Sequence, residues 1–384
     1  MKNDETPITR QKFMEELRRY QKGSVTRRHF LGVTGLGTAM AVLGGAMPML
    51  HPGRALAGDI GDRVILATWP NYHDPENFEI FREQTGAAVQ VNVFGSNEEM
   101  LAKLQAGGSG WDVFVPTNYT ITTYVEADLI EPLDLSKLPN YDASAFEARF
   151  ADAGTVGGKL YAVPKNWGTT GMSWDSSKAK APFTSWKEFF DVTMGDFSGR
   201  TIVHDYQLTT IGNALKYFGY SFNSIDPKEL ADAEKLLIEV KPHLFAITSD
   251  YQPPMRNGDA WLTMCWTGEG KQMNRDMPEI QFALGKEGGE IWSDYYAVPK
   301  NAPHREAAYA LINFLIDPQV NAREALAHGF PVADARVNAL LPEELLNDPI
   351  LHPAADLLDA LEFGAAATLT DPNRAELMAR FKSA

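Results

Sequence analysis

Cysteine is almost absent from this 384-residue sequence, which contains Cys265 and no other. A single cysteine cannot form an intramolecular disulfide, a cysteine-ligated zinc cluster or a redox pair. Cys265 lies in an apolar segment next to Trp266, where cysteine usually serves as a small buried side chain. The sequence therefore excludes the disulfide-stabilised, zinc-finger and thiol-redox classes.

Long apolar stretches are also scarce, and after residue 50 no run reaches the roughly 18 residues of a membrane span. Residues 31–50 form one glycine-rich apolar stretch, preceded by Arg27-Arg28 and followed by Ala55-Leu56-Ala57. This order is typical of a secretory signal peptide, and the paired arginines favour twin-arginine (Tat) export. A membrane anchor is the alternative, but five glycines and a proline interrupt the stretch. We expect cleavage after Ala57, no lipid anchor, and a product free in the periplasm.

Basic residues are few. Residues 1–57 hold nine basic and four acidic side chains, which leaves 26 basic and 46 acidic in residues 58–384, a net charge of −20. Such a surface repels nucleic acid and attracts cations over long range, although solubility alone also accounts for it. We therefore expect no nucleic-acid partner.

Short β-like runs alternate with helical patterns along residues 58–384, which are long enough for two lobes. This order predicts parallel βαβ units. Strands are expected at 64–68, 89–93, 112–115, 201–204, 261–266, 280–284 and 291–298, and helices at 74–84, 98–106, 206–218, 226–240, 306–316 and 317–328.

Ligands of open α/β sheets bind beyond the carboxyl ends of the strands. That rule selects a set of residues rich in aromatic rings, and Trp292 and Asp294 additionally share one face of a strand. Ring faces attract cations and a carboxylate pairs with them, so the set suits an ammonium group. Packing in the core or between lobes is the alternative for each aromatic residue, and a helix-start role is the alternative for Glu269. The candidate ligand-binding residues are Trp69, Tyr72, Thr117, Tyr119, Tyr206, Trp266, Glu269, Trp292 and Asp294.

Several short motifs occur in an order and at spacings that are typical of one protein family. They include Trp69-x-x-Tyr72, Ser96-Asn97-Glu98-x-Met100, Trp111-Asp112-Val-x-Val-Pro116, Val163-Pro164-x-x-Trp167-Gly168, Thr184-Ser185-Trp186, Lys286-Glu287-Gly288-Gly289 and Gly329-x-Pro331. With them, the chain resembles the periplasmic spermidine/putrescine-binding proteins of polyamine ABC transporters.

The resemblance implies a type II periplasmic-binding-protein fold. It has two α/β lobes, each a mostly parallel sheet flanked by helices, which close over a ligand. We expect lobe 1 to comprise residues 58–167 and 294–338, and lobe 2 residues 168–293 and 339–384. The implied function is capture of a small organic cation, such as putrescine or spermidine, for the membrane permease of an ABC importer. No enzyme activity, cofactor or metal is expected, and the protein should be a monomer.

The family's binding positions carry over only in part. Trp69, Tyr72, Thr117, Tyr119, Trp266, Trp292 and Asp294 match positions that contact the polyamine. Two acidic positions that hold a terminal ammonium correspond to Tyr206 and Thr209, and three further contacts correspond to Pro70, Phe330 and Gly364. Because only Asp294 and Glu269 supply acids, the sequence favours a smaller or singly charged ligand over full-length spermidine.

Other functions remain as alternatives. A quaternary ammonium compound or an amino-acid-like zwitterion would suit the same fold, and so would a ferric ion held by Tyr295-Tyr296. Adjacent residues of a strand point to opposite faces, which argues against the tyrosine pair. An enzyme is disfavoured because the histidines lack metal-ligand spacing and no phosphate-binding loop stands out. A ligand-loaded partner of a sensor protein would differ from this function only in its docking partner. The sequence identifies neither the transporter nor the affinity.

Overall fold

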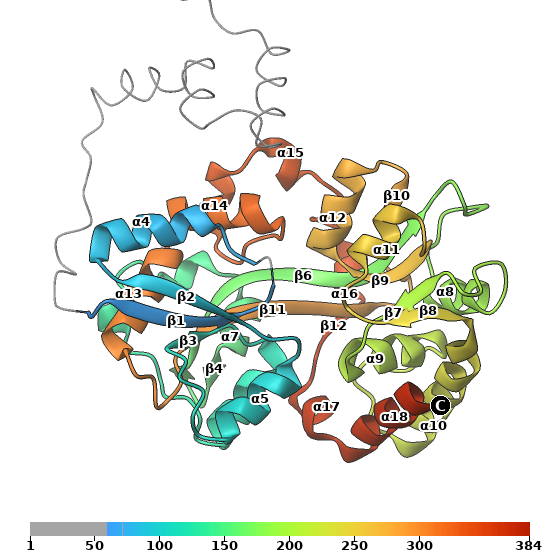
Figure 1. Cartoon of the computed structure of the whole chain (residues 1–384), viewed down its shortest axis with the longest axis horizontal. Coiled ribbons are helices and arrows are strands. Elements are labelled where there is room, and N and C mark those ends of the chain that lie inside the picture. The colour runs from blue at the N-terminus through green and yellow to red at the C-terminus, as the bar shows by residue number, and fades with distance from the viewer. Residues whose placement is uncertain (1–59, 71) are drawn as a thin grey trace, which may run out of the picture. The chain divides into compact units, whose positions relative to one another are not determined.

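The computed structural model describes residues 60–70 and 72–384 (Figure 1). The expected signal peptide, residues 1–57, lies outside the described residues, and so does Asn71. Within the described part of the chain, no helix has the length and apolar composition needed to cross a membrane.

The N-terminal third of this part alternates strands and helices as the sequence predicts. Helix α4 begins after Asp74, whose carboxylate accepts the Glu76 N–H, and ends at Gly86 in the left-handed region (φ 84°). Strand β1 pairs in parallel with β2 on one side and with β3 on the other. The elements are β1 (Arg63–Thr68), α4 (Pro75–Thr85), β2 (Ala88–Val93), α5 (Asn97–Gln105), β3 (Val113–Phe114), α6 (Ile121–Glu126), α7 (Ala148–Ala153), β4 (Thr155–Val156) and β5 (Lys159–Leu160).

The rest of the chain continues with longer strands and more helices. These are β6 (Ala162–Asp175), α8 (Trp186–Thr193), β7 (Thr201–Val203), α9 (Gln207–Tyr217), α10 (Pro227–Val240), β8 (Leu244–Ile247), α11 (Gln252–Asn257), β9 (Leu262–Trp266), α12 (Thr267–Asp276), β10 (Ile280–Ala283), β11 (Gly289–Ala297), α13 (Arg305–Leu315), α14 (Pro318–His328), α15 (Glu343–Leu346), α16 (Ala355–Asp359), β12 (Leu361–Phe363), α17 (Ala366–Thr370) and α18 (Pro372–Ser383).

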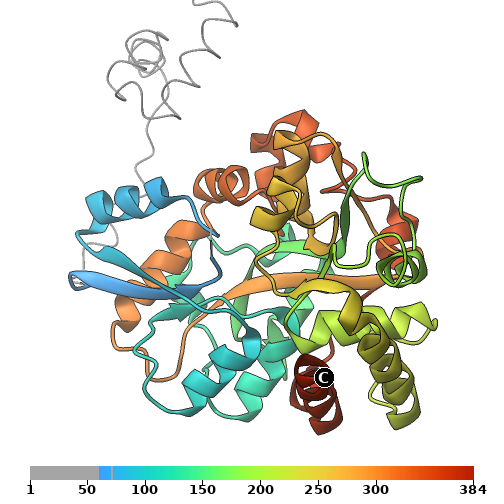
Figure 2. The same ribbon diagram turned by 45° about the vertical axis from the view of Figure 1, so that its right-hand side comes forward.

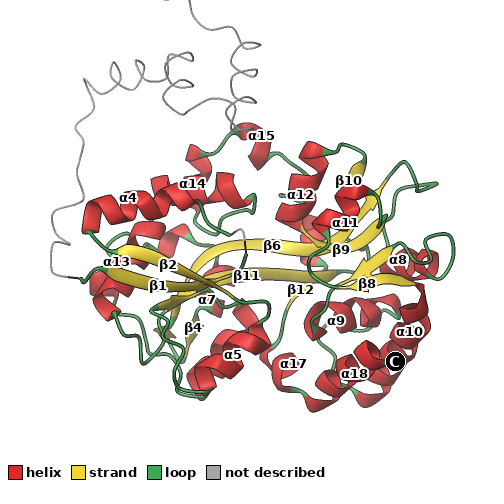
Figure 3. Cartoon of the chain, in the orientation of Figure 1, coloured by secondary structure: helices red, strands yellow, loops and turns green. Residues whose placement is uncertain are grey.

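One curled sheet runs through the described chain, in the order β2-β1-β3-β11-β6-β9-β7-β8. Both groups of outer strands pair in parallel, whereas β6 and β11 pair antiparallel with each other and with β9 and β3. Helices cover both faces of the sheet, as two views 45° apart show (Figures 2 and 3). The structure is thus the expected two-lobe α/β fold, and its sheet is mixed where the two long central strands meet.

Strand β6 was not predicted, although all of its residues except Asp175 are buried. It lacks the polar/apolar alternation of a surface strand, and it contains Pro164 and two glycines. Both glycines are required by close packing. A Cβ at Gly168 would lie 2.5 Å from Cζ2 of Trp292, and one at Gly171 would lie 2.4 Å from the Ala283 carbonyl oxygen.

The apolar side chains gather into separate cores on the two sides of this central strand pair. The first core combines β1, β3 and α13 through residues such as Leu66, Val113 and Leu311. The second core combines α8, α9, α10, β9 and α18, with Phe189, Leu237 and Phe381 among its members. Separate cores joined by two continuous strands are what a two-lobe protein without a flexible linker needs.

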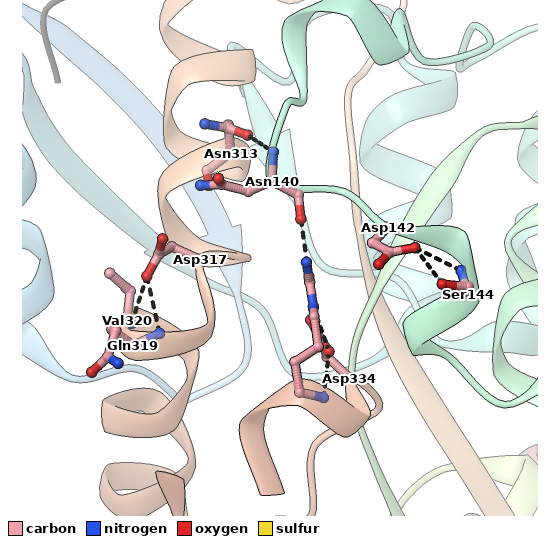
Figure 4. Close-up of polar contacts among 9 residues, drawn as sticks. Asn140, Asp142, Ser144, Asn313, Asp317, Gln319, Val320 and Asp334 are labelled. Carbon is pink, nitrogen blue, oxygen red and sulfur yellow. Dashed lines mark hydrogen bonds and ion pairs between the residues drawn. The ribbon is translucent and has the colours of Figure 1, made fainter. Parts of the chain in front are cut away.

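Polar contacts tie the segment around Asn140 to the C-terminal helices (Figure 4). The Asn140 N–H donates to Oδ1 of Asn313 at 2.8 Å, and Nη2 of Arg336 donates to the Asn140 carbonyl at 2.9 Å. Asp317 accepts the N–H groups of Gln319 and Val320 and so begins α14. The first two bonds hold α13 and the 3-10 turn at Ala335–Leu340 against the segment around Asn140.

Candidate ligand-binding site

The floor of the candidate site is a two-strand ladder formed by β6 and β11. Thr170 lies opposite Glu290, Gly168 opposite Trp292, and Asn166 opposite Asp294. Successive side chains of a strand alternate between faces, so these six residues share one face of the sheet. Figure 1 shows β6 and β11 running side by side through the centre of the fold.

Asp294 is the centre of one polar cluster. The Tyr72 hydroxyl donates to its Oδ2 at 2.7 Å, and the Thr117 hydroxyl donates to its Oδ1 at 2.7 Å. Asp294 is only 4% exposed, so both hydrogen bonds lie away from bulk water. The structure therefore brings together three residues that the sequence predicted, from the ends of β1 and β3 and from β11.

The buried amide of Asn166 completes the contacts of Tyr72. The Tyr72 hydroxyl lies 2.8 Å from Oδ1 of Asn166, yet its one proton already serves Asp294, and Nδ2 of Asn166 has no partner among the described residues. With the amide turned by 180°, Nδ2 donates to the Tyr72 oxygen. Sequence reasoning missed Asn166 because it lies in the unpredicted strand β6.

Asn97 connects Thr117 to Tyr119. Its Nδ2 lies 3.1 Å from the Thr117 hydroxyl and 3.0 Å from the Tyr119 hydroxyl. Asn97 begins α5 and is buried, as are both of its partners. The sequence analysis counted Asn97 in a family motif and expected a helix at 98–106, but it did not predict that this amide orients two candidate residues.

A buried lysine that the sequence analysis missed lies beside the Asp294 cluster. Nζ of Lys165 lies 4.1 Å from the centroid of the Tyr72 ring and donates to the Tyr72 carbonyl at 3.2 Å. Burial lowers the pKa of Lys165 to about 8, against the charges of Glu324 and Asp294. Burial raises the pKa of Asp294 to about 6, and the hydrogen bonds from Thr117 and Tyr72 and the Lys165 charge limit the rise.

A second polar cluster surrounds Glu290. The hydroxyls of Thr170 and Thr209 donate to its Oε2 at 2.6 and 3.0 Å. Glu290 is 3% exposed, and burial raises the pKa of its carboxyl to about 7, with the Asp294 charge acting in the same direction. The sequence analysis missed Glu290, although the alternation that pairs Trp292 with Asp294 extends to it.

Tyr206 and Trp266 join the Glu290 cluster through their polar atoms. Nε1 of Trp266 donates to the Tyr206 hydroxyl at 3.1 Å, and the hydroxyls of Tyr206 and Thr209 are 2.5 Å apart. The two rings are nearly parallel, with centroids 6.2 Å apart. Both residues were predicted as ligand contacts, and both lie where β7 and β9 end.

The remaining tryptophans of the candidate set are held by packing. Trp292 stands between the two carboxylates on β11, meets the Phe330 ring edge to face at 5.2 Å, and has a buried Nε1 without a partner. Trp69 donates from Nε1 to the Val115 carbonyl at 3.1 Å and packs against Phe94. Trp69 is therefore oriented by contacts within the first half of the molecule.

Glu269 is linked to Trp266 through Tyr251, whose hydroxyl accepts the Trp266 backbone N–H at 3.0 Å. It is on the first turn of α12, where burial raises the pKa of its carboxyl and hydrogen bonds from Tyr251 and Gln252 act against the rise. An acidic side chain at the start of a helix is favoured by the helix dipole, which was the alternative explanation for Glu269.

The described residues also bear on the metal-binding alternative. They contain no group of three or more histidine, cysteine or acidic side chains arranged to hold a metal ion. Tyr295 donates to the Phe150 carbonyl at 2.7 Å, whereas Tyr296 packs in the first core near Lys165. The two phenols thus point to opposite sides of β11, as strand geometry requires.

Residues 76–353 match the model of the bacterial extracellular solute-binding protein family. The putrescine-binding periplasmic protein SpuD of Pseudomonas aeruginosa is 30% identical over 80% of this chain and 88% of its own length. The spermidine/putrescine-binding periplasmic protein of Escherichia coli is 31% identical over 82% of this chain and 91% of its own. The structure of a spermidine/putrescine ABC transporter substrate-binding protein from Streptococcus pneumoniae superposes with a TM-score of 0.70 at 26% identity, covering 84% of this chain and 99% of that one.

Proposed function

We propose that this chain, which belongs to the family of bacterial extracellular solute-binding proteins, captures a small organic cation of the putrescine and spermidine class and delivers it to an ABC importer. Relatives that share about 30% of its residues are named for binding these amines. The observation that carries the proposal is the buried carboxylate of Asp294, on the same strand face as the indole of Trp292 and bonded to Tyr72.

The chemistry of this arrangement favours an ammonium group. A cation over an aromatic face gains about 0.5–2 kcal/mol, with the larger values in dry sites. A buried carboxylate gains charge-assisted hydrogen bonds from the same group, and burial without a cationic partner costs several kcal/mol. The hydroxyl donors of Asp294 are neutral, so a cationic ligand brings a charged donor to the carboxylate in addition to the nearby charge of Lys165.

The two lobes supply different parts of the site. With lobe 1 at residues 58–167 and 294–338, and lobe 2 at 168–293 and 339–384, the boundaries fall within β6 and β11. Tyr72, Thr117, Tyr119 and Asp294 then belong to lobe 1, and Tyr206, Trp266 and Trp292 to lobe 2. Closure is favoured because only the closed form makes all of these contacts with the ligand.

The cellular role follows from the N-terminal sequence. We propose that residues 1–57 are a twin-arginine signal peptide, removed after Ala57, and that the mature protein works in the periplasm, where its relatives are found. It acts as a monomer without a cofactor, binds no nucleic acid and performs no catalysis. Its partner is the membrane permease of the importer, which recognises the closed form.

A thermal-shift screen of residues 58–384 tests this function. The panel contains putrescine, spermidine, choline, amino acids and ferric citrate. Stabilisation follows RT ln(1 + [L]/Kd), so a micromolar ligand at millimolar concentration adds about 4 kcal/mol. We expect stabilisation by a polyamine. A response confined to amino acids or to ferric ion would contradict the proposal.

A further inference from the structure

We infer that the site has a second anionic end at Glu290, so that it selects a ligand with a cationic group at each end of a flexible chain. This inference rests on the proposed function and makes it more specific. It also reverses the expectation from the sequence of a smaller or singly charged ligand, because that expectation counted only Asp294 and Glu269 as acids.

Strand geometry separates the two carboxylates along one face. Glu290, Trp292 and Asp294 alternate on β11, and four residues at about 3.3 Å each place the α-carbons of the two acids roughly 13 Å apart. A charge-assisted hydrogen bond spans only about 2.8 Å, so one ammonium group cannot contact both carboxylates. Two cationic groups with an apolar link across the Trp292 ring fit this spacing.

The Glu290 carboxylate is held in place at one of its two oxygens. Both threonine hydroxyls bond Oε2, from Thr170 on the neighbouring strand and from Thr209 on α9. Hydroxyl donors stabilise the ionised carboxylate but bring no positive charge. The described hydroxyls thus orient Glu290 without neutralising it.

A further acid approaches the Glu290 cluster from α5. Oε2 of Glu98 is buried and has no hydrogen-bond partner among the described residues. Burial raises the pKa of the Tyr119 and Tyr206 phenols, and the charges of both Glu98 and Glu290 add to the rise in each case. Both phenols therefore feel the charges of two acids that come from different halves of the chain.

Glu290 and Glu98 together make this end of the site rich in acceptors, which suits the several N–H donors of an ammonium group.

The test compares amines of one and two charges by calorimetry. Wild type, Glu290→Gln and the exposed control Glu279→Gln are titrated with terminal diamines of four to eight methylenes, with spermidine, and with the monoamine matched to each diamine. We expect the wild type to bind its preferred diamine at least a hundredfold more tightly than the matched monoamine. Glu290→Gln should lose at least tenfold for the diamine and less than threefold for the monoamine, with no change in the control.

Stability measurements and a double variant separate the loss of charge from a loss of structure. Glu290→Gln keeps an acceptor for both threonine hydroxyls, so it should fold. Without ligand at pH 8 it should melt at a higher temperature than wild type, because a buried charge is removed. Adding Thr209→Glu to Glu290→Gln returns an acid to the same cluster and should restore at least threefold of the lost diamine affinity.

The outcomes distinguish this inference from the proposed function. If the wild type binds no amine at all, the proposed function fails and the inference fails with it. If the wild type binds diamines and monoamines equally well, or if Glu290→Gln binds the diamine as wild type does, the second end is wrong while amine capture stands.

Discussion

The two ends of the β11 face differ in what surrounds their acids. At the Asp294 end, Tyr72 and Thr117 hydroxyls bond both carboxylate oxygens, and the buried cation Lys165 acts on the acid. At the Glu290 end, two hydroxyls donate to a single carboxylate oxygen. The negative charge of Asp294 opposes the ionisation of Glu290, in the same direction as burial.

Burial raises both pKa values by a similar amount, from 3.8 to about 6 for Asp294 and from 4.5 to about 7 for Glu290. The two ends therefore differ in their neighbours rather than in how far their pKa values are shifted. The charge of Lys165 acts on Asp294, whereas the charge that acts on Glu290 is the like charge of Asp294, so the Glu290 end has more to gain from the charge of a ligand. Four experiments examine this contrast.

Removal of the acid at the Asp294 end should have the largest effect. Asp294→Ala leaves a bound ammonium buried without its carboxylate, and such a loss typically costs 2–5 kcal/mol. We expect affinity for the preferred polyamine to fall at least thirtyfold by calorimetry, with Glu279→Gln as the unchanged control. Unaltered affinity would show that the ligand does not pair with Asp294.

Affinity should also depend on pH. Both carboxyls hold their protons below their raised pKa values, and a cationic ligand binds the ionised forms, so affinity is lost as pH falls through about 7 and then about 6. If both acids must ionise, affinity at pH 6 is about twentyfold below that at pH 8. Glu290→Gln should retain only the lower of the two transitions. A flat profile between pH 5 and 8 would contradict both assignments.

The aromatic link between the ends should contribute less than the acids. Trp292→Ala removes ring contacts with the aliphatic chain and the cation, and we expect about a tenfold loss of polyamine affinity. Trp261→Ala, which removes a tryptophan that packs against Phe197 outside both clusters, is the control. Equal losses in the two variants would indicate general destabilisation rather than a contact with the ligand.

Removal of the buried cation Lys165 should change polyamine affinity least, and it should raise the affinity rather than lower it. Lys165→Met keeps most of the side-chain volume and removes a positive charge that competes with the ligand for Asp294. At pH 7.5 we expect affinity to rise about threefold, and the fall in affinity on acidification to begin at a higher pH, since the pKa of Asp294 loses a group that lowers it. Weaker binding would mean that Lys165 positions Tyr72 for the ligand instead.

The three side chains that meet at the Asp294 end were all among the candidates chosen from the sequence. Tyr72 and Thr117 follow strands whose βα pattern was clear, and alternation on β11 paired Trp292 with Asp294. The family and the two-lobe fold were also predicted correctly, and the comparisons confirm both.

The Glu290 end was missed for a local reason. The expected strand began at Ile291, because Gly288-Gly289 resembles a turn, and both glycines do have positive φ values of 92° and 152°. The observed strand begins at Gly289, which brings Glu290 into the ladder. The polar residues of β6, Lys165 and Asn166, were missed because that strand shows neither alternation nor a purely apolar run.

The most direct test of the two-ended site is a crystal structure of residues 58–384 with the tightest-binding diamine. We predict one nitrogen within about 3 Å of the Asp294 carboxylate, the other within the same distance of Glu290, and the methylene chain against the Trp292 ring. A complex in which Asp294 faces bulk solvent, or in which an anion lies between the lobes, would contradict the account.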